Sequence, residues 1–363
     1  MRLLYAVCGE GSGHATRSKV SLDHLVARGH DVVVAASSQA ESYLKPHHRV
    51  VPIAGVGMRS TDGCFDLRRT VEENAQRLPR ILAENARTWA TVELFAPEAV
   101  VTDFDFFGWS FARAKGLPLL SIDNGLAANV LEHDPSVLTN GQLTFLRQFN
   151  RMMVADADHY IVTTFFYPPV RQRYAGRVTL VPPILRPEVL QIVRNPPPAQ
   201  DHILVYKSSY VDDDSILRPL AALSDTRFVA YGLKDDAALP PNVTRRPFDQ
   251  DAFLRDVASA RAIVSNGGMS LIGESLALGK PIYAVPLRGQ FEQVVNAAYL
   301  RKLGYGSSSE ALDPLLLRVF LTNLPRHEAA IRAAAQHDEN RTLRATLDSL
   351  LVAPRYPSFR DPR

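Results

Sequence analysis

Short, continuously apolar segments recur along this chain, and glycine turns or stretches with helical spacing separate them. Such segments are too short for typical helices and lack the alternation of half-exposed strands, so they predict strands buried on both faces of a parallel sheet. Their alternation with helical stretches is typical of α/β domains. The predicted strands are Leu3–Val7, Asp31–Ala36, Ala99–Thr102, Leu117–Ile122, Tyr160–Thr163, Val178–Val181, His202–Tyr206, Phe228–Tyr231, Ala262–Ser265 and Ile282–Val285.

A proline-dense segment divides this series in two. Pro182, Pro183, Pro187 and Pro196–Pro198 lie close together, and prolines at this density predict a stiff linker. We therefore predict an N-terminal domain over 1–183, a linker over 184–200 and a C-terminal domain over 201–363. A helical segment over Leu316–Leu351 follows the last strand, and its final helix is placed to pack back on the N-terminal domain. Residues 352–363 are rich in proline and arginine and predict a terminal tail.

The composition is that of an ordinary globular protein. Of the 363 residues, 46% are hydrophobic and 22% are charged, which excludes a disordered chain. A net charge of +3 is too small to predict a nucleic-acid partner, although it suits an anionic ligand or a peripheral contact with the inner membrane surface. The cysteines show no metal-ligand spacing, and no segment predicts a membrane span or a signal peptide. We expect a cytoplasmic protein without a disulfide.

The first predicted strand leads into the glycine loop Gly9-Glu10-Gly11-Ser12-Gly13-His14, which opens a helix. Glycines here let the backbone turn tightly and direct N–H groups into a cleft, where they favour an anion. The loop does not match a dinucleotide-binding fingerprint, because histidine replaces its third glycine and the second strand ends without a ribose-binding acid. We expect Gly11, Ser12 and Gly13 to form an acceptor loop.

His14 itself has two interpretations. A histidine at the positive end of a helix, facing a cleft, suits a general base. Alternatively, it caps the helix by bonding a backbone carbonyl.

The densest group of polar residues lies between Ser265 and Ala297. The segment Asn266-Gly267-Gly268-Met269-Ser270 connects a predicted strand to a helix, and its glycines let N–H groups approach a diphosphate. Glu274, one turn later, is placed to accept hydrogen bonds from ribose hydroxyls, and Glu292 with Gln293 suits the hydroxyls of a hexose. The alternative is an ordinary strand–loop–helix unit with a serine cap and buried glutamates.

This segment carries a resemblance to a known family. The string Gly267-Gly268-x-Ser270-x-x-x-Glu274-x-x-x-x-Gly279-x-Pro281, continued by Pro286 and Glu292-Gln293-x-x-Asn296-Ala297, resembles the donor-site signature of GT-B nucleotide-sugar glycosyltransferases. Their two Rossmann-like domains face each other across a cleft. They include plant UDP-glucosyltransferases and the bacterial enzyme that adds N-acetylglucosamine to the lipid-linked peptidoglycan precursor. The resemblance implies that the glycines and Ser270 hold the diphosphate, Glu274 the ribose, and Glu292 with Gln293 the donor sugar. Met269, between the glycines and Ser270, is expected to belong to the same nucleotide-sugar site.

The resemblance extends to the N-terminal half. It covers Gly11-x-Gly13-His14 and Thr102-Asp103-Phe104-x-x-x-Gly108-Trp109, followed by Gly116-Leu117-Pro118. It implies that His14 is the catalytic base and that Asp103 orients it.

The chain departs from the family pattern at several positions. Asn266 replaces a histidine of the plant members, although an amide still donates to phosphate, and Glu292 replaces an aspartate. Lys207 and Ser208 are expected to reach the phosphates from a loop that lacks the usual glycines; a solvated lysine is the alternative. Phe248 is expected to line the base pocket, with an ordinary core phenylalanine as the alternative.

These residues predict an inverting transfer of a hexose or N-acetylhexosamine from a UDP-sugar to an acceptor hydroxyl, on a small molecule or a lipid. The helix after Gly268 offers fixed dipoles to the leaving diphosphate, so we expect neither a metal nor a cofactor. Asp103-Phe104-Asp105 permits a metal interpretation that belongs to another class of glycosyltransferase.

Apolar residues with interspersed arginines over Leu67–Phe95 and Leu143–Met153 predict either core packing or an exposed face for a lipid-linked acceptor.

Two other functions fit the same two-domain architecture. A non-hydrolysing UDP-sugar 2-epimerase normally carries a different loop after its first strand, in place of the Gly-Glu-Gly-Ser-Gly-His of this chain. A non-catalytic nucleotide-sugar sensor would bind the donor but tolerate loss of His14.

Overall fold

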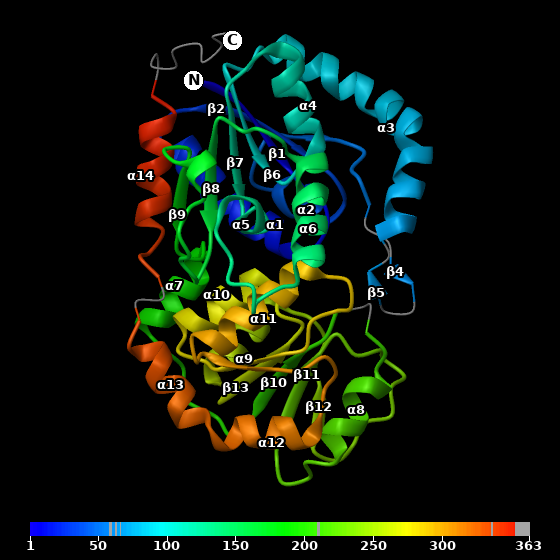
Figure 1. Ribbon diagram of the computed structural model, residues 1–363, viewed down its shortest axis with the longest axis vertical. Helices are drawn as coiled ribbons and strands as arrows, with labels where there is room; N and C mark the ends of the chain where they lie inside the picture. Colours follow the sequence, from blue (N-terminus) through cyan, green and yellow to red (C-terminus); the bar gives the residue numbers. More distant parts are fainter. Residues whose placement is uncertain (58–59, 62–63, 66, 209–210, 335–336, 353–363) are drawn as a thin grey trace.

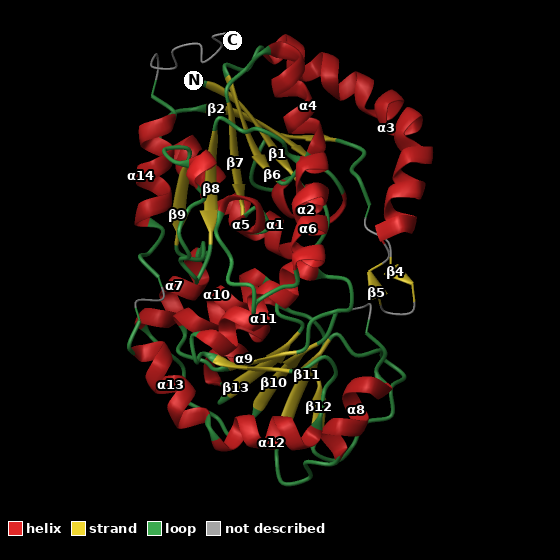
Figure 2. Cartoon of the chain, in the orientation of Figure 1, coloured by secondary structure: helices red, strands yellow, loops and turns green. Residues whose placement is uncertain are grey.

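The computed structural model describes residues 1–57, 60–61, 64–65, 67–208, 211–334 and 337–352. Two parallel sheets form two α/β domains, which lie one above the other in Figure 1. Figure 2 shows that helices flank both sheets. The predicted tail lies, apart from Val352, outside the described residues.

The N-terminal domain is built on a seven-stranded sheet with the order β3-β2-β1-β6-β7-β8-β9, and all of its strand pairs are parallel. A separate antiparallel pair, β4 with β5, lies between β3 and α3 in the chain. The strands are β1 Arg2–Val7, β2 Asp31–Ala36, β3 Val50–Pro52, β4 Ser60–Thr61, β5 Cys64–Phe65, β6 Ala99–Asp103, β7 Leu119–Asp123, β8 His159–Thr163 and β9 Val178–Val181. The helices are α1 Ser12–Ala27, α2 Ser38–Leu44, α3 Leu67–Phe95, α4 Phe106–Lys115, α5 Ala127–Val130, α6 Asn140–Met153 and the short 3-10 helix η1 Gln172–Tyr174.

The C-terminal domain repeats this plan with a six-stranded parallel sheet of order β12-β11-β10-β13-β14-β15. Its strands are β10 Ile203–Tyr206, β11 Phe228–Tyr231, β12 Val243–Arg245, β13 Ala262–Ser265, β14 Ile282–Ala284 and β15 Gly306–Ser308. The helices from the linker onward are α7 Pro187–Arg194, α8 Asp214–Ala221, α9 Gln250–Ser259, α10 Met269–Ala277, α11 Phe291–Lys302, α12 Pro314–Thr322, α13 Leu324–Arg332 and α14 Arg341–Leu350.

Both faces of each sheet are buried, as the apolar runs predict. Along β1, Leu4 and Ala6 join the cluster under α4, whereas Leu3, Tyr5 and Val7 join the opposite cluster, which includes residues of α1. This is the expected result of a strand period of two when helices cover both faces.

The linker prediction was wrong in one respect. Helix α7 lies inside the segment 184–200 and begins at Pro187, with Val189 and Leu190 buried. A proline at the first helical position removes no hydrogen bond, because that N–H has no partner within the helix, and its fixed φ suits the helix start. Proline density therefore did not exclude a helix here.

The predicted helical segment Leu316–Leu351 contains three helices, the first of which begins at Pro314. Asn323 separates α12 from α13, and Asn340, in the left-handed region with φ of 61°, precedes α14. Helix α14 lies beside the N-terminal sheet (Figure 1), where Leu343 and Leu347 enter the same cluster as Leu3 and Leu22. The chain thus crosses back to its first domain.

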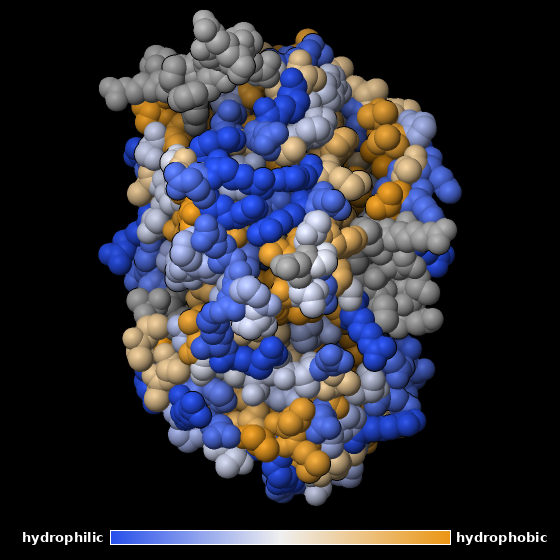
Figure 3. Space-filling model, in the orientation of Figure 1, coloured by the Kyte–Doolittle hydropathy of each residue, from blue (hydrophilic) through white to orange (hydrophobic). Residues whose placement is uncertain are grey.

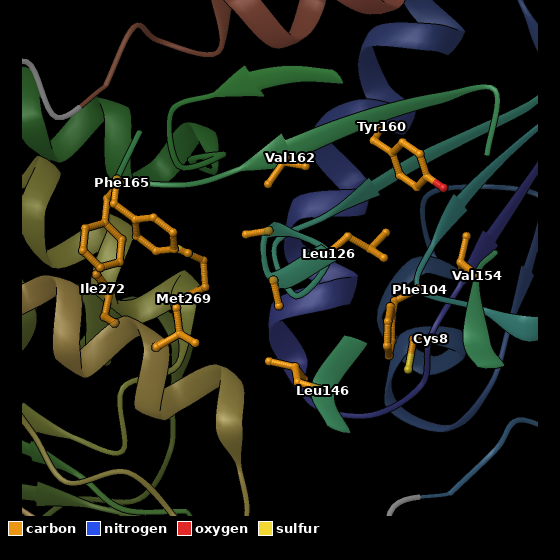
Figure 4. Packing of buried hydrophobic residues seen from close by; sticks show 14 of the residues in the cluster. Cys8, Phe104, Leu126, Leu146, Val154, Tyr160, Val162, Phe165, Met269 and Ile272 are labelled. Atoms are coloured by element: carbon orange, nitrogen blue, oxygen red, sulfur yellow. The ribbon is translucent and has the colours of Figure 1, made fainter. Parts of the chain in front are cut away.

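The two domains also share apolar contacts beneath the cleft. The ring of Phe166 stacks on that of Tyr299 with centroids 3.9 Å apart, and Figure 4 shows Phe165 beside Met269 and Ile272 of α10. These contacts fix how the two sheets face each other.

The order of each sheet locates the sites. In open parallel sheets, ligands bind beyond the carboxyl ends of the strands at the point where the strand order reverses. This point lies between β1 and β6 in the first sheet and between β10 and β13 in the second. The loops that begin at Cys8, Phe104, Lys207 and Asn266 therefore meet at the cleft.

Candidate functional site

His14 and Asp103 come together at the first of these points. His14 lies in the first turn of α1 and Asp103 ends β6, so the neighbouring strands β1 and β6 bring them side by side. The His14 Nδ1 atom lies 2.7 Å from Asp103 Oδ1, and the ring stacks against Phe104. The imidazole is 18% exposed, whereas the carboxylate is fully buried. This bond to a carboxylate, rather than to a backbone carbonyl, rules out the capping interpretation of His14.

Arg17, one turn after His14, fixes the proton on the imidazole. Its Nη2 lies 2.5 Å from Asp103 Oδ1 and 2.9 Å from Asp123 Oδ1, so both of its hydrogens are used by carboxylates. It also lies 2.8 Å from His14 Nδ1, but it has no hydrogen left to donate there. Nδ1 therefore carries the proton that reaches Asp103, and Nε2 is left as an acceptor.

The charges of this cluster favour an ionised Asp103. Burial raises the pKa of Asp103, but the charge of Arg17 and then His14 outweigh it, so that the pKa falls to about 2. Arg17 Nε and the Ser18 hydroxyl donate to the second carboxylate oxygen, at 2.8 and 2.9 Å. Burial raises the pKa of Asp123 to about 6, although Arg17 opposes this shift. Asp103 is the carboxylate that stays charged throughout the physiological range.

The cluster continues across the cleft into the C-terminal domain. Arg17 Nη1 donates to Asn124 Oδ1, and Asn124 Nδ2 donates to Glu292 Oε1 at 2.6 Å. A continuous set of hydrogen bonds thus joins His14 to Glu292, which lies in the first turn of α11. We call His14, Asp103, Arg17, Asp123, Asn124 and Glu292 the polar network.

Three members of the polar network have the chemistry of metal ligands. Atoms of His14, Asp103 and Asp123 lie within 4.8 Å of one another. The Arg17 guanidinium already contacts all three, at 2.5–2.9 Å, so a cation there would have to displace it. Asp105 does not add a ligand, because its carboxylate caps α4 by accepting from the N–H groups of Phe107 and Gly108.

The second predicted cluster faces the first one directly. Gly268 precedes α10 without a side-chain cap, and Gly11 does the same for α1. A Cβ atom on Gly13 would lie 2.6 Å from Ser270 Oγ, so the acceptor loop and the α10 N-terminus are in contact. Two uncapped helix N-termini therefore meet at the cleft, and each favours an anion through its N–H groups and its dipole.

Glu274 is buried on α10 and already has a partner. Arg186 donates to both of its carboxylate oxygens, from Nε at 2.7 Å and from Nη2 at 3.0 Å. This arginine belongs to the predicted linker, and the residue just before that linker packs closely on α10, since a Cβ on Gly273 would lie 2.4 Å from the Pro183 side chain. Each oxygen keeps one further lone pair for a ribose hydroxyl.

The structure corrects the expectations for Lys207 and Asn266. Lys207 is only 4% exposed, and its ammonium pairs with Asp213 at 2.7 Å, so it is neither solvated nor free for a phosphate. The Asn266 amide accepts from the Ser208 N–H and donates one of its two hydrogens to the Val285 carbonyl, so it joins three loops and keeps only its second hydrogen for a ligand. Sequence spacing did not reveal these competing partners: Asp213 follows Lys207 in the same connection between β10 and α8, whereas the partners of Asn266 lie on other loops.

The remaining predicted donor residues differ in their accessibility. Gln293 accepts a hydrogen bond from the Leu287 N–H, which holds the loop before α11. Phe248 is 63% exposed and packs against Tyr231 and Phe253 at the edge of the domain, so the core interpretation is wrong for it. Its exposed face is compatible with stacking on a base.

A small aromatic pocket opens beside His14, between the two domains. It is lined by His14, Glu292, Asn150 and the rings of Phe104, Phe145, Phe149 and Phe291, and its volume is about 50 Å³. Phe145 of α6 and Phe291 of α11 meet edge to face across the domains. The side chains of the segment Leu143–Met153 are thus partly core and partly pocket lining.

The segment Leu67–Phe95 forms helix α3, and part of its apolar face is exposed. Leu78 and Leu82 are exposed, whereas Ile81 and Val92 are buried. Among the described residues, no helix has both the length and the apolar character that a membrane span requires.

Sequence reasoning missed Arg17, Ser18, Asp123 and Asn124. A signal was present, because Arg17 follows His14 by three residues and so lies on the same face of α1. Asp123-Asn124-Gly125 is a polar group at the carboxyl end of a predicted strand, where sites of parallel sheets form. Neither signal alone says which carboxylate the arginine would meet.

Comparisons with known proteins agree with this architecture. The family model described as Glycosyl transferase family 1 matches residues 1–325 of the chain. An uncharacterized glycosyltransferase of Methanosarcina mazei is 25% identical over 335 residues, which cover 84% of this chain and 85% of that protein.

Solved structures with the same fold include two ligand complexes. The glycosyltransferase VinC in complex with DTDP has a TM-score of 0.65 at 18% identity, covering 96% of this chain and 98% of that one. UGT2 of Phytolacca americana, complexed with UDP-2-fluoro-glucose and pterostilbene, has a TM-score of 0.65 at 14% identity with the same coverage.

Proposed function

The chain belongs to glycosyl transferase family 1 and is a glycosyltransferase of the GT-B fold, and from this premise we propose that it transfers a hexose or N-acetylhexosamine from a UDP-sugar to an acceptor hydroxyl with inversion. The observation that carries the proposal is the contact between the His14 loop and the N-terminus of α10. It puts a base held by a carboxylate opposite the N-terminus of α10, which is suited to a diphosphate.

His14 is the proposed base. Its Nε2 accepts the proton of the acceptor hydroxyl as the oxygen attacks the anomeric carbon. The imidazolium that forms is stabilised by Asp103, which stays ionised because its pKa is about 2. Arg17 keeps that carboxylate in place and keeps the proton on Nδ1.

The donor diphosphate is proposed to lie at the N-terminus of α10, with Ser270 as a side-chain donor and Glu274 on the ribose. As the bond from sugar to phosphate breaks, the N–H groups and dipole of α10 stabilise the developing negative charge without a metal. Attack from the His14 side and departure on the α10 side form a single displacement, which inverts the anomeric centre. UDP is favoured over TDP on the family resemblance alone, and related structures hold each of these nucleotides.

The acceptor is proposed to be an apolar molecule with a nucleophilic hydroxyl, because four phenylalanine rings line the pocket next to His14. A volume of about 50 Å³ admits only water, so the domains must part for the acceptor to enter. Exposed Leu78 and Leu82 on α3 support a lipid-linked acceptor presented at a membrane surface.

A transfer assay tests this function. The chain is incubated with UDP- and TDP-sugars, with and without phenolic and lipid-linked alcohols, and products are resolved by NMR. We expect nucleotide release that depends on the acceptor, a β-linked product from an α-linked donor, and no effect of a chelator. Conversion of the UDP-sugar to its 2-epimer without any acceptor would support the epimerase, and binding without turnover would support the sensor.

Replacing Glu274 by glutamine tests the donor site. We expect UDP to bind roughly tenfold more weakly by calorimetry, because a charge-assisted hydrogen bond to the ribose is lost. The variant also leaves Arg186 buried without its counter-charge, so its unfolding temperature must be measured in parallel. The matched control is Arg186→Gln, which removes the partner but keeps the carboxylate and should retain affinity. Equal UDP affinity in a folded Glu274→Gln variant contradicts the ribose role.

A further inference from the structure

A second cavity lies in the N-terminal domain, away from the interdomain cleft. It has a volume of about 370 Å³ and is formed where α6 ends and where the chain approaches β9. Its lining includes Arg151, Arg173, Arg177, Tyr160, Tyr174 and Asp156. Figure 3 shows strongly hydrophilic side chains gathered on this face of the domain.

The positive charge here is larger than the lining alone suggests. Arg147 and Arg171 lie next to it, and burial followed by the charges of Arg171, Arg173 and Arg151 lowers the pKa of Arg147. Within the part of the chain that the structure describes, none of these five arginines has a carboxylate oxygen within 4 Å. The five guanidinium groups therefore gather positive charge around one cavity without a carboxylate to balance it.

Several of these guanidinium groups are already held in position. Arg147 donates to the Ala128 carbonyl at 2.8 Å, Arg171 to the Asn129 carbonyl at 3.0 Å, and Arg177 to the Ala157 carbonyl at 2.5 Å. Arg173 donates to the Tyr174 hydroxyl and lies over its ring. These bonds hold positive charges close together although the charges repel one another. An anion in the cavity would relieve that repulsion.

The cavity is separate from the acceptor pocket but is joined to it through one layer of side chains. Asn150, which lines the acceptor pocket, donates to Asn129 Oδ1 and to the Gly125 carbonyl, both at 2.8 Å. Asn129 in turn lines the arginine cavity. The hydrogen-bonded side chains of Asn129 and Asn150 therefore connect an occupant of this cavity to the pocket beside His14.

We propose that this arginine-lined cavity binds a phosphate-bearing ligand at a site distinct from the donor and acceptor sites. The guanidinium forks suit phosphate oxygens, and Tyr160 and Tyr174 offer an apolar floor for the group that carries the phosphate. The phosphate is either that of a soluble molecule or that of a lipid headgroup.

Calorimetry of inorganic pyrophosphate with the full chain tests the proposal, with saturating UDP present to occupy the donor site. The variant Arg151→Gln/Arg173→Gln should bind pyrophosphate roughly tenfold or more weakly, because charge-assisted hydrogen bonds are lost. The matched control, Arg218→Gln/Arg318→Gln, removes two exposed arginines of the C-terminal domain and should leave the affinity unchanged. Vesicles containing phosphatidylglycerol, compared with phosphatidylcholine alone, form the second arm.

A gain of binding provides a variant that misfolding cannot mimic. Asp156 is the acidic residue among those named in the lining, and its φ of 49° is a conformation that asparagine accepts readily. Asp156→Asn should tighten pyrophosphate binding severalfold, because it removes a negative charge from the cavity.

Loss of pyrophosphate binding in the double arginine variant identifies a soluble phosphate ligand. If only anionic vesicles bind, and the same variant loses them, the phosphate belongs to a lipid. The proposal is overturned if neither probe binds, or if both arginine variants bind equally. Failure of UDP to saturate the donor site would instead count against the proposed donor.

Discussion

Replacing His14 by alanine is expected to lower the transfer rate by roughly 10²- to 10⁴-fold, the usual contribution of a positioned general base. The imidazole is the one group of the polar network that is both partly exposed and left with a free acceptor nitrogen beside the aromatic pocket. Without it, the acceptor hydroxyl must lose its proton to water during the attack. Steady-state kinetics with the preferred donor measure the loss.

The donor site should be unaffected by this change. UDP affinity, measured by calorimetry, is expected to stay within about twofold of the wild type, because α10 and Glu274 lie in the other domain. The matched control is His47→Ala, which removes an exposed histidine at the end of α2 and should keep full activity. Nearly normal turnover of the His14→Ala enzyme would show that another group is the base.

Replacing Arg17 by methionine is expected to lower the free energy of unfolding by about 3–5 kcal/mol, the cost of removing one partner of a buried ion pair. Arg17 is buried and contacts Asp103, Asp123 and Asn124. Methionine keeps the apolar stem but leaves two carboxylates buried without a counter-charge. Urea unfolding at pH 7.5 measures the loss, and transfer activity should fall with it because Asp103 no longer holds His14.

The pH dependence of this loss identifies its cause. In the wild type, Asp103 has its pKa lowered from 3.8 to about 2, so its stabilising contribution is present above pH 3.8 and is lost as the pH falls toward 2. In the variant, burial raises the pKa values of Asp103 and Asp123. At a pH below these values both carboxylates can be protonated, which relieves the penalty of burying an unpaired charge. The difference in stability between the two proteins should therefore be larger at pH 7.5 than at pH 4.

Arg28→Met is the matched control for Arg17. Arg28 follows the same helix and pairs with Asp348 at the surface, where an ion pair contributes at most about 1 kcal/mol. An equal loss of stability at both pH values would mean that Arg17 acts through packing rather than through its charge. Arg17→Lys adds a further readout, because it keeps the charge but loses the fork that reaches Asp103 and Asp123 together.

The fold was largely predictable because the central strands are apolar on both faces. Each of the ten predicted strands corresponds to an observed strand, with boundaries shifted by up to two residues. The two strands of the separate antiparallel pair, β4 and β5, were missed, and the strands of the parallel sheets that were missed, β3, β12 and β15, all lie at sheet edges. β15 is Gly306-Ser307-Ser308, which has no hydrophobic residue and is defined by its hydrogen bonds to β14. Burial on one side leaves too little apolar patterning for a prediction.

The sequence by itself determined which loops of this chain are candidates for ligand binding. Glycine loops after β1 and β13, Asp103 at the end of β6, and the helix starts of α1 and α10 all follow from local patterns, because the carboxyl ends of parallel strands share one edge. Tertiary structure alone decided how the charges are paired. Arg17 with Asp103, Glu274 with Arg186, and Asn124 with Glu292 are 86, 88 and 168 residues apart, and Lys207 lies buried against Asp213. An ionic partner is chosen by distance and burial rather than by sequence spacing, so only the folded chain shows which polar residues remain available for chemistry.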